Sequence, residues 1–191
     1  MYFQKTWKIA MNDILYSLSD PLITKQQIEE KVRSLADRIT HESAGFSSLH
    51  LIGVLKGSFI FLADLARALS LPVTLDFIQV SSYGSQTKGD VDLKFLKDLT
   101  HPIEGKDVIL VEDIIDSGRT IQKLKEILLK KNPKSLRICT LLDKPSRRES
   151  PVTIDWVGFS IPDAFVVGYG LDVNENFRNL PYIAEAISLK E

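Results

Sequence analysis

Cysteine is among the scarcest residue types of this chain, because Cys139 is the only one among 191 residues. A single thiol cannot close a disulfide within the chain, so the fold has to be stabilised by a packed core. Such sparing use of cysteine is typical of a reducing compartment, and we expect a cytoplasmic protein. Because Cys139 lies within an apolar run, we expect it to fill space in that core.

The chain also has no long apolar run and no excess of charge of either sign. No segment approaches the roughly 20 apolar residues that cross a bilayer, and residues 1–10 have neither the apolar centre nor the cleavage site of a signal peptide. The 24 basic and 25 acidic residues nearly cancel, which argues against nonspecific attraction to nucleic acid or to an anionic membrane. We therefore expect small-molecule partners, with no nucleic acid and no membrane.

The few histidines show no metal-ligand spacing. The chain has three of them, His41, His50 and His101, and none stands in a motif with a second ligand. Each is predicted to be a surface residue or a structural residue.

Periodicity along the chain predicts the α/β class. Strands are expected at residues 49–54, 73–83, 91–99, 108–111, 136–142, 152–159 and 165–169, and helices at 24–40, 58–69 and 120–131. This alternation favours a mainly parallel twisted sheet with helices on both faces and ligands at the carboxyl ends of the strands. We expect a single domain, residues 1–191, with a core at about 24–170 and a small hood formed by the terminal segments.

The most informative stretch runs from an apolar strand through two carboxylates into a turn that opens a helix. The turn and the first helical residues are Ser117, Gly118, Arg119 and Thr120. Backbone N–H groups at such a helix start bind phosphate. Glu112 and Asp113, at the carboxyl end of the strand, can accept hydrogen bonds from vicinal hydroxyls and hold a divalent metal. An isolated acidic pair would indicate an ordinary solvated loop, but the whole run predicts a sugar-phosphate site.

Residues 112–120, Glu-Asp-Ile-Ile-Asp-Ser-Gly-Arg-Thr, resemble the phosphoribosyl-pyrophosphate (PRPP) signature of the type I phosphoribosyltransferases. The Glu-Asp pair has the form found in members that act on 6-oxopurines. The resemblance extends from the first predicted helix to Tyr182. It implies the type I phosphoribosyltransferase core and Mg²⁺-dependent transfer of 5-phosphoribosyl from PRPP to hypoxanthine, and to guanine as well, with IMP or GMP and pyrophosphate as products. A homodimer or homotetramer is usual for the family.

A second strand-to-helix turn, residues 55–58, has a similar layout. By itself Leu-Lys-Gly-Ser at this place is a plain turn with a solvated lysine. In the resemblance it matches the pyrophosphate loop, where a cis peptide bond precedes the lysine, so that bond would join Leu55 and Lys56. The resemblance implies that Lys56, Gly57 and Arg178 bind pyrophosphate.

The purine site is implied by two further segments. Lys144 follows a predicted strand; it is either an ordinary surface lysine or, in the resemblance, the reader of the purine 6-oxo group. Residues 162–172 match the base-binding segment, in which Phe165 stacks on the purine, the Val166 backbone bonds its edge, and Asp172 holds a second metal ion through water. On sequence alone an aromatic residue within a strand is expected in the core. Val173 stands where the family commonly has an aromatic residue.

Ser82 and Tyr83 resemble the start of the family's flexible catalytic loop. Residues 85–90 that follow contain no apolar anchor, which is typical of a mobile loop. Closure of such a loop would exclude water from the reacting centre. A simple connection between two strands is the alternative interpretation.

The implied chemistry assigns Asp116 as the general base, which takes or shares the purine N7 proton. Two alternatives remain open. One is a PRPP-binding RNA regulator, which would need a basic face; the only basic clusters, residues 130–131 and 147–148, are of a kind that is usually solvated. The other is a phosphoribosyltransferase that prefers another base, such as xanthine, adenine or a pyrimidine. Lys144 and the Phe165-Val166 segment argue for a 6-oxopurine, which leaves xanthine open, and the Glu112-Asp113 pair argues against adenine.

Overall fold

The computed structural model describes residues 9–11, 14–84 and 91–189. Its strands are β1 (Ile9–Met11), β2 (Ile14–Ile23), β3 (Leu49–Leu55), β4 (Val73–Gly84), β5 (Val91–Lys97), β6 (Asp107–Ile115), β7 (Ser135–Asp143), β8 (Trp156–Ser160), β9 (Val166–Val167) and β10 (Ile183–Leu189). Its helices are α1 (Lys25–Glu42), α2 (Phe59–Ala68) and α3 (Arg119–Leu129), with a 3₁₀ turn at Pro145–Arg147.

The main sheet has six strands in the order β5-β4-β3-β6-β7-β8. Its neighbours pair in parallel, except for the antiparallel pair β4–β5. Parallel pairing requires crossover connections, which α2 and α3 provide. The predicted fold class, a mainly parallel sheet with helices and a hood, is confirmed.

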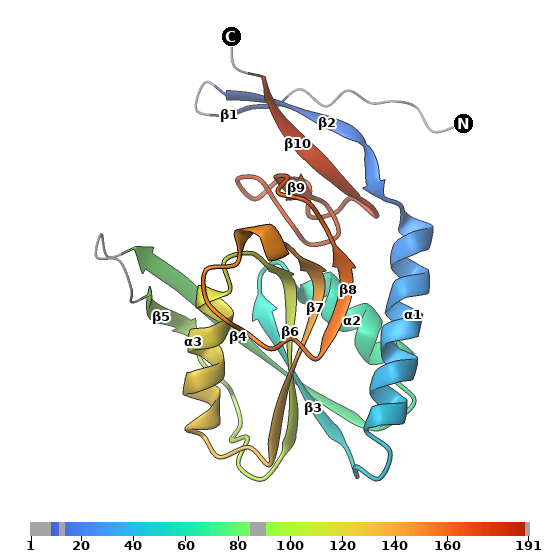
Figure 1. Cartoon of the computed structure of the whole chain (residues 1–191), viewed down its shortest axis with the longest axis vertical. Helices are drawn as coiled ribbons and strands as arrows, with labels where there is room; N and C mark the ends of the chain where they lie inside the picture. The colour runs from blue at the N-terminus through green and yellow to red at the C-terminus, as the bar shows by residue number, and fades with distance from the viewer. Residues whose placement is uncertain (1–8, 12–13, 85–90, 190–191) are drawn as a thin grey trace.

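The two faces of this sheet carry separate cores. Helices α1 and α2 pack on one face against β3, β6 and β7 through residues such as Leu51 and Val111. Helix α3 packs on the other face through Ile121, Leu124 and Leu128, and Figure 1 shows the helices on opposite sides of the sheet. Cys139 is fully buried in the first core, as expected.

The hood is a second sheet of four antiparallel strands in the order β1-β2-β10-β9. Both terminal segments contribute to it, and it lies above the main sheet in Figure 1. The strand predicted at 165–169 is shorter than expected and belongs to this hood. Its pairing stops after Val167 because Gly168 and Tyr169 take left-handed φ angles of 102° and 51°.

Several other element ends differ from the sequence expectation. Strand β6 continues to Ile115, so the acidic pair lies within it. The strand predicted at 152–159 begins only at Trp156. Val152 and Ile154 pack on the second core without sheet pairing. Just before β8, the Asp155 N–H donates to the Ile138 carbonyl oxygen, and the Asp155 carboxylate accepts from the Ile138 N–H. Helix α1 begins as predicted, with Thr24 and Gln27 forming a capping box.

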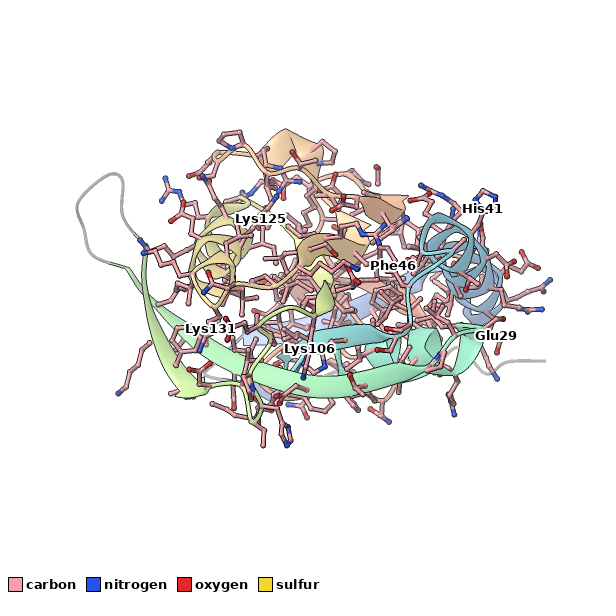
Figure 2. All side chains as sticks on the ribbon, turned by 90° about the horizontal axis from the view of Figure 1, so that it is seen from below. Glu29, His41, Phe46, Lys106, Lys125 and Lys131 are labelled. Atoms are coloured by element: carbon pink, nitrogen blue, oxygen red, sulfur yellow. The ribbon has the colours of Figure 1, made fainter. Side chains whose placement is uncertain are left out.

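Figure 2 views the molecule from below, at the amino ends of the parallel strands, where Lys106 precedes β6. His50 lies at this end and is buried; its Nδ1 is 2.7 Å from Thr74 Oγ1. His41 and His101 are exposed, as predicted. No helix among the described residues is long and apolar enough to span a membrane.

Candidate active site

The candidate site lies at the carboxyl ends of three neighbouring strands. Strand β3 leads into Lys56, β6 into Asp116, and β7 into Lys144. Because β3, β6 and β7 are adjacent and parallel, these three segments leave the sheet at the same edge. This edge faces the hood in Figure 1.

Two neighbouring carboxylates, Glu112 and Asp113, lie near the end of β6. Asp113 is buried, and Oε2 of Glu112 is buried with no hydrogen-bond donor among the described residues. Burial, and then the neighbouring Asp113 carboxylate, raise the pKa of Glu112 well above its ordinary value. Burial likewise raises the pKa of Asp113, although backbone hydrogen bonds oppose this shift. Charged carboxylates in this environment are stabilised when they bind a cation or accept hydrogen bonds from hydroxyl groups.

Two glycines allow three chain segments to meet beside these carboxylates. A Cβ at Gly57 would lie 1.7 Å from Oδ2 of Asp113, and a Cβ at Gly170 would lie 2.0 Å from the carbonyl oxygen of Gly57. The predicted pyrophosphate loop therefore lies directly between the acidic pair and the segment that follows β9. A side chain at Gly57 would push the Asp113 carboxylate away, and one at Gly170 would push the Gly57 backbone away.

The phosphate turn opens α3. Gly118 is the N-cap residue with φ of 81°, a left-handed conformation that favours glycine. A Cβ there would also come within 2.9 Å of the Ser150 carbonyl oxygen. The carbonyl oxygen of Ser117 accepts hydrogen bonds from the N–H groups of Glu149 and Ser150, and Glu149 pairs with Arg119. The predicted residues 117–120 thus form a helix start that a neighbouring loop fixes in place.

The cationic side of the site joins Lys56 to the segment after β9. The peptide bond between Leu55 and Lys56 is cis, as the resemblance implied. Lys56 Nζ lies 2.9 Å from Glu175 Oε2, and this hydrogen bond holds the pKa of Glu175 below its ordinary value. Arg178 contacts Asp172 at 2.8 Å and donates to the carbonyl oxygen of Gly170. Its Nε is buried with no acceptor among the described residues.

A chain of alternating charges connects Asp116 to Lys144. Arg147 Nε lies 3.2 Å from Asp116 Oδ1, and its Nη1 lies 3.3 Å from Asp163 Oδ2. The other carboxylate oxygen of Asp163 is 3.9 Å from Nζ of the buried Lys144. The sequence interpretation of residues 147–148 as a solvated pair is wrong for Arg148, which is 19% exposed, pairs with Asp143 and donates to the Asp116 carbonyl oxygen. Arg147 is 52% exposed, although it pairs with both carboxylates.

Phe165 is not a core residue, contrary to the expectation from sequence alone. It is 51% exposed, and its nearest ring partner is Tyr16 of the hood, with centroids 6.4 Å apart. Val166 is buried in β9 beside it. Val173, the departure from the family pattern, is buried in the small core of the hood with Val167 and Phe177.

The remaining predicted loop residues lie at the end of β4. Ser82 pairs with Leu93 and Tyr83 with Asp92 through the β4–β5 ladder. Their side chains and residues 85–90 lie outside the described part of the chain.

Sequence reasoning missed three charged residues of this site. Glu175 is 119 positions from its partner Lys56, and Asp163 and Arg147 are separated from their partners by other elements. Their types and spacing carry no signal of these contacts. One indication was available for Asp163, because it lies inside the segment that matches the base-binding motif.

Comparison with known proteins places these features in a family. Residues 21–174 match the model of the phosphoribosyl transferase domain. Hypoxanthine phosphoribosyltransferase of Salmonella typhimurium is 51% identical over 172 residues, which cover 89% of this chain and 96% of that protein. Hypoxanthine-guanine phosphoribosyltransferase of Bacillus subtilis is 46% identical over 168 residues, covering 88% and 93%.

Solved structures show the same similarity. A hypoxanthine-guanine phosphoribosyltransferase from Bacillus anthracis has a TM-score of 0.86 and 50% identity, covering 90% of this chain and 100% of that one. Hypoxanthine phosphoribosyltransferase from Trypanosoma cruzi, in complex with the product IMP, has a TM-score of 0.82 and 41% identity, covering 88% and 94%.

Proposed function

Because this chain belongs to the phosphoribosyltransferase family, we propose that it is a purine-salvage enzyme that transfers 5-phosphoribosyl from PRPP to N9 of hypoxanthine, forming IMP and pyrophosphate. The observation that carries the proposal is 51% identity to a hypoxanthine phosphoribosyltransferase over 89% of the chain. The geometry of the strand ends supports it, because phosphate-, cation- and base-directed groups meet at one edge of the sheet.

Three groups of residues would hold PRPP. The N-terminus of α3 and the turn at residues 117–120 bind the 5-phosphate through backbone N–H groups. Glu112 and Asp113 accept hydrogen bonds from the ribose hydroxyls. Lys56, the Gly57 backbone and Arg178 bind the pyrophosphate. Nε of Arg178, for which the described part of the chain offers no acceptor, is a further donor to it.

Magnesium fits the acidic pair. Mg²⁺ is commonly bound through one or two carboxylates together with substrate oxygens and water. Within residues 9–11, 14–84 and 91–189, the buried Oε2 of Glu112 has no hydrogen-bond donor, and no group of three or more His, Cys, Asp or Glu side chains could hold a metal ion. Oxygens of PRPP and water would complete the coordination. Glu112 and Asp113 would hold one ion, and Asp172 a second through water. When bound, Mg²⁺ would offset the charge on the leaving pyrophosphate.

The base would lie between Phe165 and the row of charged side chains that runs from Asp116 to Lys144. The exposed ring of Phe165 offers a stacking surface, the Val166 backbone bonds the purine edge, and Lys144 donates to the 6-oxo group. N9 of the purine attacks C1′ of the ribose as the bond from C1′ to the pyrophosphate oxygen breaks. Asp116 accepts the proton that the base loses at N7, which requires it to exchange its Arg147 partner for the substrate.

Guanine is proposed as a second substrate, since relatives named hypoxanthine-guanine phosphoribosyltransferase are 46–50% identical. We also propose a cytoplasmic location, which suits the single buried thiol, and assembly into a homodimer or homotetramer. Exposed apolar side chains on the α2 face of the main sheet, Leu75 and Leu96, are 47% and 57% exposed and offer a surface for assembly.

The test is nucleotide formation from PRPP and Mg²⁺ with hypoxanthine, guanine, xanthine and adenine in parallel, for the unsubstituted protein and for Asp116→Asn. We expect IMP and GMP, with kcat lowered about 10²- to 10⁴-fold in the variant while PRPP binding is retained. Tight PRPP binding without turnover of any base would contradict the proposal and favour the PRPP-binding regulator. Preferential turnover of xanthine would favour the other alternative.

A further inference from the structure

The strongest unassigned feature of the site is the position of Glu175. Its Oε2 lies 2.9 Å from Nζ of Lys56, and its Oε1 lies 3.4 Å from Nη2 of Arg178. One carboxylate therefore contacts both of the cations that the proposed function assigns to pyrophosphate. Sequence reasoning gave Glu175 no role.

Resting on that proposed function, we propose that the Glu175 carboxylate occupies the pyrophosphate site while it is empty and must leave before PRPP or pyrophosphate binds. Carboxylate and phosphoryl oxygens use the same charge-assisted hydrogen bonds to lysine and arginine. The Glu175 contacts with Lys56 and Arg178 would therefore compete directly with those that an incoming pyrophosphate group makes.

The two cations differ in how firmly they are held without this contact. The Arg178 side chain is 18% exposed and is anchored to Asp172 and to the Gly170 carbonyl oxygen. The Lys56 side chain is 52% exposed, and its ammonium group donates a hydrogen bond to Glu175. Long exposed side chains lose rotamer freedom when a ligand fixes them. Competition from Glu175 therefore acts mainly on Lys56, because Arg178 keeps its contacts with Asp172 and the Gly170 carbonyl oxygen when Glu175 leaves.

Glu175 is itself placed so that it can leave. Its side chain is 64% exposed, so its carboxylate can be rehydrated at little cost. Its backbone is held by a 2.7 Å hydrogen bond from the Glu175 N–H to Asp172 Oδ2. A fixed backbone with an exposed side chain lets the carboxylate swing away and return. Return of the carboxylate to both cations would favour release of the product pyrophosphate.

The experiment measures dissociation constants by calorimetry for PRPP, pyrophosphate and IMP, each with Mg²⁺, on the full chain. Glu175→Gln removes the charge and keeps the shape. We expect it to bind PRPP and pyrophosphate about two- to fivefold more tightly, the order of effect that exposed ion pairs have. IMP carries no pyrophosphate group, so its dissociation constant should not change.

Two further variants make the test decisive. Glu175→Asn also removes the contacts and suits the left-handed φ of 67° at this position, so it should shift pyrophosphate binding in the same direction even if Glu175→Gln folds poorly. Glu29→Gln is the matched control, because Glu29 also pairs with a lysine, Lys25 of α1. Its side chain is 51% exposed, against 64% for Glu175, and it lies at the edge of the view in Figure 2. It should change no affinity.

Equal or weaker pyrophosphate binding in the Glu175 variants would overturn this inference and leave the proposed function standing. An equal shift for IMP would overturn it as well, because it would show a general change of the site. If the unsubstituted protein bound no PRPP at all, the proposed function would fail and the inference would fail with it.

Discussion

At the scale of single residues, the site depends on backbone groups that approach too closely for any side chain. Gly57 shows this most directly, because its missing Cβ leaves the space that the Asp113 carboxylate occupies. The motif identified Gly57 from sequence, but it did not show which atom the glycine makes room for. That contact joins β6 to the loop after β3, which are 56 residues apart in the chain.

Gly57→Ala is expected to displace Asp113 and the pyrophosphate loop together. The methyl group would lie 1.7 Å from Oδ2 of Asp113, so we expect a loss of stability of about 1–3 kcal/mol from overpacking and a loss of PRPP affinity. Denaturant unfolding and PRPP titration would measure the two effects.

The matched control is Gly45→Ala, where a Cβ meets nothing within 4 Å but φ is 91°. That variant should lose about 1–2 kcal/mol from the left-handed backbone alone and keep its PRPP affinity. Normal PRPP binding by Gly57→Ala would show that the loop adapts and would contradict the prediction.

At the scale of elements, one buried carboxylate fixes the connection after β5. Asp76 of β4 is 4% exposed and accepts hydrogen bonds from the backbone N–H groups of Phe77, Thr100 and His101. Lys97 Nζ lies 3.2 Å from it. Burial alone would raise the pKa of Asp76, but these donors outweigh burial and hold the pKa well below its ordinary value.

A folded-state pKa below the unfolded value means that the charged carboxylate stabilises the fold. This contribution is fully present above the unfolded pKa of about 4 and is lost as the pH falls toward the lower folded value. Asp76→Asn should therefore cost on the order of 2–4 kcal/mol at pH 7, because it removes a buried charged acceptor. The difference in free energy of unfolding between the unsubstituted protein and Asp76→Asn should shrink below about pH 4.

Unfolding curves from pH 7 to pH 3 would test this dependence. Asp37→Asn is the control, because Asp37 is an exposed carboxylate on α1, and it should change stability little at any pH. A stability difference between wild type and Asp76→Asn that stayed constant down to pH 3 would show that shape, rather than charge, explains the effect.

At the scale of the whole molecule, strands β4 and β5 of the six-stranded sheet carry exposed leucine side chains on the face opposite α3. Val80 and Phe95 pair across β4 and β5 and pack on the α3 side. Side chains alternate along a strand, so Leu96 faces the opposite side, where it is 57% exposed. Leu75 of β4 faces the same side. This surface supports the proposed assembly.

Leu96→Glu should weaken that assembly, because burying a carboxylate without a partner costs several kcal/mol. Sedimentation velocity would show a shift toward the monomer at a given protein concentration. Leu129→Glu is the control, since Leu129 is similarly exposed at 48% but ends α3 on the other face. If Leu96→Glu had the same oligomeric state as the unsubstituted protein, the interface would lie elsewhere on the surface.

The sequence by itself determined the local features of this protein. The capping box at Thr24, the apolar strand at residues 108–111 and the glycine turn into α3 are all readable because each depends on neighbouring residues. The order of strands and helices also indicated the parallel sheet, since few topologies suit that alternation. The predicted local elements agree with the observed fold because natural sequences favour the same conformation locally and in the whole fold.

Only the tertiary structure decided which distant groups meet. The contacts of Lys56 with Glu175, of Arg147 with Asp116 and Asp163, and of Gly57 with Asp113 each join separate elements. The exposure of Phe165 was decided in the same way, because β9 leaves the main sheet and pairs with β10 in the hood. Such contacts depend on the packing of whole elements, and that packing leaves no periodic or compositional mark on the residues that make them.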